Sequence, residues 1–157
     1  MKPNEKTNVM RVLDQKKVVY ESHSYTPDAT MTGEEIAALL KEDPAHVFKT
    51  LVTRGKTGQY YVFVVPVAAE LELKKAAKAA GEKSIEMIKQ KELLPLTGYV
   101  HGGCSPIGMK KAFKTFIHET AEPLDKMFVS AGKVGFQVEL SPQDLAKTVG
   151  CGFADIV

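Results

Sequence analysis

The sequence predicts an α+β fold, and three features of the 157-residue chain support this prediction. Two β-type runs, 47–54 and 59–66, are separated by Gly55-Lys56-Thr57-Gly58, which indicates a hairpin. Short helical segments with recognisable caps stand before and after this hairpin. The strand-like runs come in neighbouring groups and do not alternate strictly with helices, which disfavours an alternating parallel-sheet design.

The chain begins with a predicted helix and a predicted strand. The helix starts after Thr7, whose hydroxyl can cap the first turn. Its apolar residues recur at helical spacing at Val9, Met10, Val12 and Leu13. Residues 18–25 are rich in β-branched and aromatic side chains and therefore predict a strand.

A second helix is predicted where Thr32-Gly33-Glu34-Glu35 forms a capping box. The Thr32 hydroxyl can accept a hydrogen bond from the Glu35 amide, and the Glu35 carboxylate can reach back. We expect the helix to end before Pro44, because a residue that precedes proline avoids helical backbone angles. Its buried stripe is expected to consist of Ile36, Leu39 and Leu40.

The later elements are predicted from similar local signals. Residues 72–80 form an alanine-rich helix that Gly81 closes. Ser141-Pro142-Gln143-Asp144 opens a last helix, with serine at the cap, proline in the first turn and an acid near the positive end of the helix dipole. Three further runs predict strands: 113–118, 126–130 and 134–140.

Composition indicates one globular domain over residues 1–157. Hydrophobic residues make up 44% of the chain and charged residues 25%, and the net charge is +2, which excludes a disordered protein. The longest apolar stretch, 60–69, is about half of the roughly 20 residues that a membrane-spanning helix needs. The amino terminus lacks the apolar core of a signal peptide, and the two cysteines show no zinc-ligand spacing. We therefore expect a reduced, cytoplasmic protein that does not contact a membrane.

No motif indicates an enzyme-borne nucleophile or a metal site. The four histidines show neither HxH nor HExxH spacing, and the chain contains no GxSxG elbow. We therefore expect neither a metal nor an organic cofactor. Gly103 and Gly108 have the spacing of a phosphate-binding loop, but Met109 stands where that loop carries lysine, so nucleotide binding is only weakly indicated.

Two segments could nevertheless line a ligand site. The amides of the glycine-rich run 102–108 could approach a ligand closely or form an oxyanion site, or the run could be a plain connection. Within this run, Cys104 could be a small core residue or a reactive thiol. Lys49 interrupts a β-run and shares a face with Val47 and Leu51. It is either a solvent-facing edge charge or an ammonium in a pocket, where it could hold a phosphate or polarise an ester carbonyl.

Lysines gather in two clusters, at 74–78 and 110–114. Such clusters are usually solvated faces and less often RNA-binding patches. Arginine occurs only at Arg11 and Arg54, which disfavours bidentate readout of bases. Any contact with nucleic acid would therefore be made mostly with its backbone and would be sensitive to salt.

Several motifs follow one another along the chain: Phe48-Lys49-Thr50-Leu51, residues 73–78, 97–99 and 102–108, Val129-Ser130-Ala131-Gly132-Lys133 and residues 141–147. In this order and spacing they resemble the YbaK/EbsC family over roughly Val9 to Val157. Members of this family resemble the editing domain of bacterial prolyl-tRNA synthetase, and characterised members are free-standing deacylases of Cys-tRNA(Pro). The resemblance implies a mixed, partly barrel-like β-sheet surrounded by helices, with one pocket.

The resemblance also implies a set of site residues. Lys49 matches the central pocket lysine of the family, and the implied catalytic residues are Lys49, Gly102 and Ser130. The implied substrate-binding residues are Tyr25, Thr32, Gly103 and Gln137. Thr32 stands where several members carry phenylalanine, and Gln137 where some carry aspartate, so either change could widen the pocket or alter its polarity.

By resemblance, the chain is expected to be a trans-editing aminoacyl-tRNA deacylase for Cys-tRNA(Pro). The substrate thiol would attack its own ester, while the protein positions the ester and stabilises the developing charge. The expected partners are aminoacyl-tRNA and, as a further candidate, prolyl-tRNA synthetase. Two alternatives stay open: an alanine- or serine-specific deacylase of the same fold, and a non-catalytic module that binds RNA or a synthetase.

Overall fold

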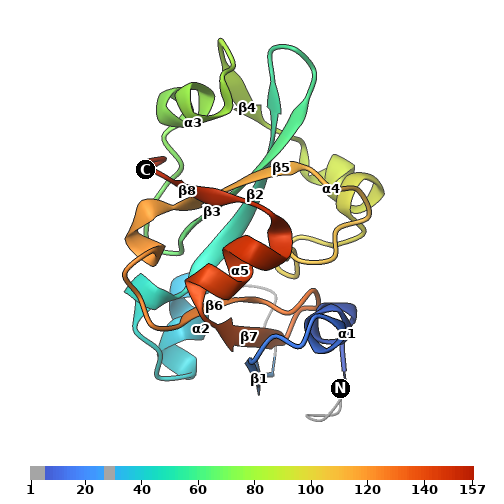
Figure 1. Cartoon of the computed structure of the whole chain (residues 1–157), viewed down its shortest axis with the longest axis vertical. Helices are drawn as coiled ribbons and strands as arrows, with labels where there is room; N and C mark the ends of the chain where they lie inside the picture. The colour runs from blue at the N-terminus through green and yellow to red at the C-terminus, as the bar shows by residue number, and fades with distance from the viewer. Residues whose placement is uncertain (1–5, 27–30) are drawn as a thin grey trace.

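The computed structural model describes residues 6–26 and 31–157 and contains helices and strands in mixed order (Figure 1). The α-helices are α1 (Asn8–Gln15), α2 (Gly33–Leu39), α3 (Leu73–Ala80), α4 (Gln90–Thr97) and α5 (Pro142–Val149), and the 3₁₀ helices are η1 (Pro44–His46) and η2 (Glu119–Ala121). The strands are β1 (Glu21–Ser24), β2 (Phe48–Gly55), β3 (Tyr60–Pro66), β4 (Ile85–Met87), β5 (Lys114–His118), β6 (Met127–Ser130), β7 (Phe136–Leu140) and β8 (Gly152–Ala154). None of the helices in the described ranges has the length and apolar character needed to cross a bilayer.

The strands form two sheets, which confirms the predicted α+β class. The larger sheet has the order β4-β2-β3-β5-β8 and is mixed, because β3 and β5 and also β5 and β8 run parallel. The smaller sheet has the order β1-β7-β6 and is antiparallel. The sheets meet at an isolated bridge between Val47 and Phe128 and do not close into a barrel. In Figure 1 the smaller sheet lies at one end of the long axis, and β4 and α3 lie at the other.

Local signals placed several elements correctly. Thr7 accepts a hydrogen bond from the Met10 amide at the start of α1. Both hydrogen bonds of the predicted capping box are present at Thr32 and Glu35. The β2–β3 hairpin has the predicted turn, and Ser141 caps α5.

Other expectations were wrong in part. The strand predicted over 18–25 is shorter, because β1 covers only Glu21–Ser24. The stripe expected at Ile36, Leu39 and Leu40 is only partly buried: Ile36 and Leu40 are half-buried, but Leu39 is 53% exposed, and Ala37 is buried instead. The short strands β4 and β8 and the helix α4, which contains Pro95, were not predicted.

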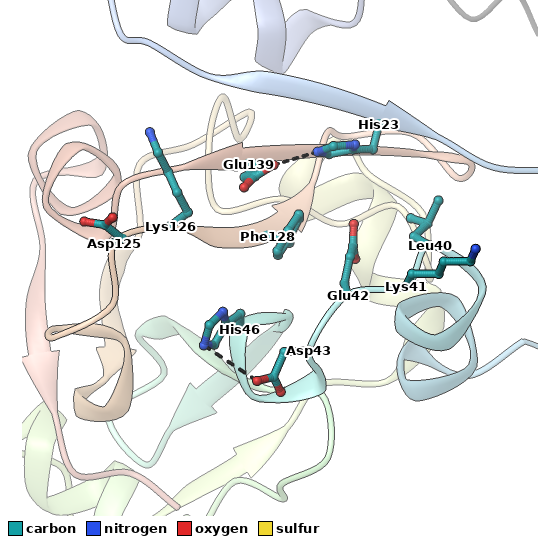
Figure 2. A pocket seen from close by; sticks show the side chains of 10 residues that line it. All are labelled: His23, Leu40, Lys41, Glu42, Asp43, His46, Asp125, Lys126, Phe128 and Glu139. Atoms are coloured by element: carbon teal, nitrogen blue, oxygen red, sulfur yellow. Dashed lines mark hydrogen bonds and ion pairs between the residues drawn. The ribbon is translucent and has the colours of Figure 1, made fainter.

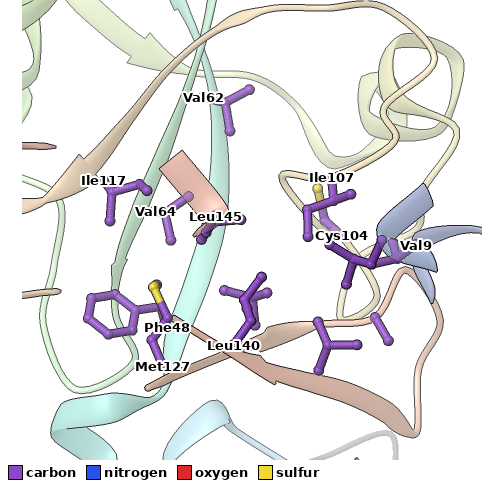
Figure 3. Packing of buried hydrophobic residues seen from close by; sticks show 14 of the residues in the cluster. Val9, Phe48, Val62, Val64, Cys104, Ile107, Ile117, Met127, Leu140 and Leu145 are labelled. Carbon is purple, nitrogen blue, oxygen red and sulfur yellow. The ribbon is translucent and has the colours of Figure 1, made fainter. Parts of the chain in front are cut away.

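The main hydrophobic core fills the space between the two sheets. One face of β3 supplies Val62 and Val64, and the inner face of the smaller sheet supplies Met127 and Leu140. Helices α1 and α5 close this core with buried apolar residues, among them Leu145 of α5 (Figure 3). A second cluster lies on the opposite face of the larger sheet, beneath α3. Packing on both faces fixes β2 and β3 as a rigid base for the site.

Candidate active site

A cavity of about 270 Å³ opens beside the first half of β2. Its lining comes from α2, β2, the glycine-rich run and the smaller sheet, which are distant in sequence. It contains six of the seven residues implied by the family resemblance: Tyr25, Thr32, Lys49, Gly102, Ser130 and Gln137. The structure therefore brings these residues together, while their roles stay predictions.

Lys49 lies on the wall of this cavity, opposite Val65 of β3. Its Nζ lies 3.6 Å from Oε1 of Glu70, whose side chain is 92% exposed, whereas the Lys49 side chain is 30% exposed. An ion pair with so exposed a carboxylate is weak and exchanges readily with another anion. Of the two interpretations left open by the sequence, the structure supports the ammonium at a pocket.

Over its first half, β2 pairs with β3 on one side, and within the described residues no strand of the larger sheet pairs with it on the other side. Strand β4 pairs with β2 only along Thr53–Gly55. The segment before Thr53 is therefore an edge of the sheet beside the cavity. The hydroxyl Oγ1 of Thr50, which also lines the cavity, is buried and has no hydrogen-bond partner within 6–26 and 31–157.

The glycine-rich run forms another wall, and its two first glycines differ. Gly102 lines the cavity and has a φ of +85°, a left-handed conformation that favours glycine. Gly103 does not line the cavity. A Cβ on Gly103 would lie 3.0 Å from the backbone nitrogen of Val134, so Gly103 instead allows the run to pack against that backbone.

The remaining predicted residues come from β6, β7 and the segments beside β1 and α2. Ser130 and Gln137 stand directly opposite each other on β6 and β7 and share one face of the smaller sheet. The Tyr25 amide donates to the carbonyl of Gly135, which holds Tyr25 beside that sheet. The Thr32 hydroxyl, although at the cavity, is already engaged as the cap of α2.

The cysteine at the cavity is not poised to react. Cys104 lines the cavity but is buried, and burial raises the pKa of its thiol to about 12. The thiolate is the nucleophilic form of cysteine, so Cys104 stays unreactive near neutral pH. Burial also raises the pKa of Cys151 to about 11.

A second cavity, of about 400 Å³, lies against the smaller sheet and is lined by titratable groups (Figure 2). His23 Nε2 lies 2.8 Å from Glu139 Oε1, and the ring of His23 packs at a tilt against Phe128. Strand register also places Glu21 near this pair, so that ligand-type atoms of Glu21, His23 and Glu139 lie within 4.8 Å of one another. No sequence motif indicated this cluster, because it depends on the pairing of β1 with β7.

Glu42 reaches from this second cavity toward the smaller sheet (Figure 2). Burial raises the pKa of Glu42 to about 7, although the nearby His23 and a hydrogen bond with Gln137 act in the opposite direction. No sequence signal pointed to Glu42, since its contact with Gln137 joins distant parts of the chain. No sequence signal pointed to Phe136 or His101 either, although both line the first cavity.

The sequence and the fold are similar to those of known proteins. The sequence profile of the aminoacyl-tRNA editing domain matches residues 27–148. The chain belongs to the aminoacyl-tRNA editing domain family. It is also 43% identical over 156 residues to a candidate Cys-tRNA(Pro)/Cys-tRNA(Cys) deacylase, EbsC of Enterococcus faecalis, an alignment that covers 99% of this chain and 95% of that protein.

The chain is also similar to a segment of a larger protein and to solved structures. The chain is 28% identical over 137 residues to a proline–tRNA ligase of Kosmotoga olearia, covering 85% of this chain and 23% of the ligase. A crystal structure of a candidate trans-editing enzyme for prolyl-tRNA synthetase has a TM-score of 0.80 at 22% identity and covers 97% of this chain and 98% of its own. A further structure, of a hypothetical protein, has a TM-score of 0.87 at 23% identity, covering 96% and 99%. These two structures share the fold of this chain.

Proposed function

We propose that this chain is a trans-editing deacylase that removes cysteine from Cys-tRNA(Pro). Membership of the aminoacyl-tRNA editing domain family and the 43% identity to EbsC support an aminoacyl-tRNA substrate. The observation that carries the reaction type is the lining of the first cavity. It contains the ammonium of Lys49 and a glycine wall, but, within the described residues, no hydrogen-bonded pair of nucleophile and base.

The substrate itself supplies the nucleophile in this proposal. The cysteinyl sulfur attacks its own carbonyl carbon, a carbon–sulfur bond forms, and the bond from that carbon to the ribose oxygen of the tRNA breaks. The thiol proton ends on the departing ribose oxygen, so the products are free tRNA and a cyclic thioester that water later opens to cysteine. The ring is four-membered and strained, so the protein must hold the thiol and carbonyl close together.

The cavity residues have complementary roles in this step. The Lys49 ammonium faces the negative charge that develops on the ester oxygen, where one well-placed donor lowers the barrier by about 3 kcal/mol. The left-handed turn at Gly102 lets the backbone approach the ester closely. The Ser130 hydroxyl, which accepts a 3.2 Å hydrogen bond from the Gly132 amide, can still donate to the substrate.

The partners follow from the same substrate. Because the relatives include proline–tRNA ligases that contain a similar segment, prolyl-tRNA synthetase is the proposed source of the mischarged tRNA. Mischarged tRNA(Pro) arises where translation takes place, so the proposal assigns this chain to the cytoplasm. It requires neither a metal nor an organic cofactor.

A deacylation panel on tRNA(Pro) charged with cysteine, alanine, serine or proline tests this proposal. We expect the cysteinyl ester to be cleaved at least about tenfold faster than the others, because only it carries a thiol. The matched substrate is S-methylcysteinyl-tRNA(Pro), in which a thioether of similar size cannot form the ring. Cleavage of this ester at the cysteinyl rate, or a faster reaction with alanine or serine, would contradict the proposal. The Cys104→Ala variant is expected to retain the wild-type rate.

A further inference from the structure

Gln137 stands on the wall between the two cavities. It lies on β7, the central strand of the smaller sheet, where it is 5% exposed and faces Ser130 on one side and His23 on the other. It lines the cavity that contains Lys49, while its amide contacts Glu42 from the second cavity. A change at Glu42 can therefore reach the first cavity through one side chain.

The Gln137 amide has one favourable orientation beside the ionised Glu42. An ionised carboxylate only accepts hydrogen bonds, and an amide donates through its nitrogen and accepts through its oxygen. With the nitrogen turned toward Glu42, it donates to Oε1 at 3.0 Å and to Oε2 at 2.9 Å. With the oxygen turned that way, two acceptors would face each other.

The backbone of Glu42 is fixed by the end of α2. Lys41 has a φ of +57°, and its amide donates to the carbonyl of Ala38. The Glu42 amide donates to the carbonyl of Ala37 at 2.8 Å. This is the Schellman arrangement that commonly ends a helix. The turn therefore fixes the backbone position from which the Glu42 side chain extends.

The Gln137 oxygen is then the polar atom of this side chain that remains for a ligand in the cavity with Lys49. An aminoacyl ester carries an α-amino group, which donates N–H bonds in both its protonated and its neutral form. Resting on the proposed function, we propose that Glu42 is a positioning residue, which orients Gln137 so that its amide oxygen accepts a hydrogen bond from the α-amino group of the substrate. The negative charge of Glu42, one amide group away, strengthens this acceptor.

The proposal implies a dependence on pH, because a protonated Glu42 no longer fixes the amide. Five titratable groups from other elements line the second cavity with Glu42: His23 of β1, His46 of η1, Glu139 of β7, and Asp125 and Lys126 before β6. The chain neighbours of Glu42, Lys41 and Asp43, also line this cavity. Burial raises the pKa of Glu42 to about 7. The orienting effect is therefore expected above pH 7 and is lost as the pH falls below it.

The test compares two esters that differ only in the α-amino group. Cys-tRNA(Pro) carries it, and 3-mercaptopropionyl-tRNA(Pro) lacks it but keeps the thiol. In Glu42→Gln, which removes the charge without changing the shape, we expect the cysteinyl rate at pH 7.5 to fall about tenfold. The rate with 3-mercaptopropionyl-tRNA(Pro) is expected to change less than twofold.

Glu139→Gln is the matched control, because Glu139 also lines the second cavity but its carboxylate pairs with His23. This variant is expected to leave the ratio of the two rates unchanged. Equal losses with both esters in Glu42→Gln, or no loss with either, would overturn the proposal. If the wild-type protein cleaved neither ester, the proposed function itself would fail, which is a distinct result.

A double variant keeps the proposal testable if Glu42→Gln folds poorly, and a pH profile tests the proposal further if Glu42→Gln folds well. The double variant Glu42→Gln, Gln137→Glu reverses the pair and leaves an acceptor toward the cavity, so it is expected to restore the preference for the cysteinyl ester. The second measurement is the ratio of the cysteinyl rate to the 3-mercaptopropionyl rate between pH 6 and 8. In Glu42→Gln this ratio can change only through titration of the substrate's amino group. In the wild type, we expect the ratio to rise more steeply with pH, because Glu42 also ionises. A folded double variant without the preference, or parallel pH profiles, would contradict the role of Glu42.

Discussion

The two cavities lie against the same sheet, yet their linings have opposite chemical characters. The cavity at Lys49 contains one lysine and one histidine among apolar, hydroxyl and amide groups. The cavity at His23 contains four carboxylates, two lysines and two histidines. A group of titratable residues with a perturbed pKa commonly marks an active site, and that criterion alone would select the second cavity. A reaction whose nucleophile belongs to the substrate instead needs positioning and charge stabilisation, which the first cavity offers.

The largest difference between the two cavities is expected when one lysine in each is replaced by alanine. Lys49→Ala is expected to lower the rate of deacylation by about 10²–10³-fold, the loss typical of one donor to a developing oxyanion. Lys126→Ala removes an exposed lysine from the second cavity and is expected to change the rate less than twofold. Single-turnover rates and thermal unfolding of both variants measure this. A similar loss in both variants would show that the two cavities act together in the reaction.

Lys49→Arg sharpens the same test. Arginine keeps the charge but replaces a compact ammonium by a planar fork, which a fitted cavity cannot place in the same position. We expect a rate close to that of Lys49→Ala. A rate near wild type would mean that Lys49 acts as a diffuse charge.

A smaller effect is expected at Gly102. Alanine at its φ of +85° strains the backbone and displaces the amide beside the ester, so Gly102→Ala is expected to lower the rate about tenfold. Gly150 has a similar φ of +76°, and a Cβ there would meet no atom within 4 Å, so Gly150→Ala carries the same strain away from both cavities. Both variants are expected to lose about 1 kcal/mol of stability, measured by urea unfolding. Only Gly102→Ala should lose activity.

The smallest effect is expected on the stability of the folded protein when Glu42, in the second cavity, is replaced. The pKa of Glu42 is raised above its ordinary value of 4.5, so its ionisation destabilises the folded state increasingly as the pH rises from 4.5 to about 7. Glu42→Gln removes this cost. We expect the Tm to rise by about 2–4 °C at pH 8, which corresponds to about 1 kcal/mol in a protein of this size, and to change little at pH 4.5. A lower Tm at pH 8 would show that the carboxylate stabilises the fold.

The sequence predicted those features that depend on contacts within a few residues. The cap hydroxyls of Thr7, Thr32 and Ser141 each accept a hydrogen bond from the amide three residues later, so the local sequence is sufficient. Helix α4 was missed because it contains Pro95, and its cap residue, Lys89, makes no side-chain cap hydrogen bond. The strands β4 and β8 are three-residue edges whose pairing is decided by distant partners.

The candidate site shows the same division. Lys49 and Gly102 were singled out because a lysine in a β-run and a glycine-rich loop are unusual in any sequence, although only the resemblance gave them a role. Glu42 had no such signal, since its importance arises from a turn at the end of α2 and from the register of β7. Burial, which raises the pKa of Cys104 and of Glu42, is likewise a property of the fold.

The pairing of β1 with β7 has a consequence for synthesis of the protein on the ribosome. Strand β1 is made early, but its partner in the smaller sheet, Phe136–Leu140, is made near the end of the chain. Tyr25 cannot reach its bonded position beside Gly135 until that segment has left the exit tunnel. The wall formed by Tyr25, Ser130 and Gln137 is thus completed late in folding. A nascent chain that stops before β7 would expose an unpaired β1 and would lack one wall of the cavity at Lys49.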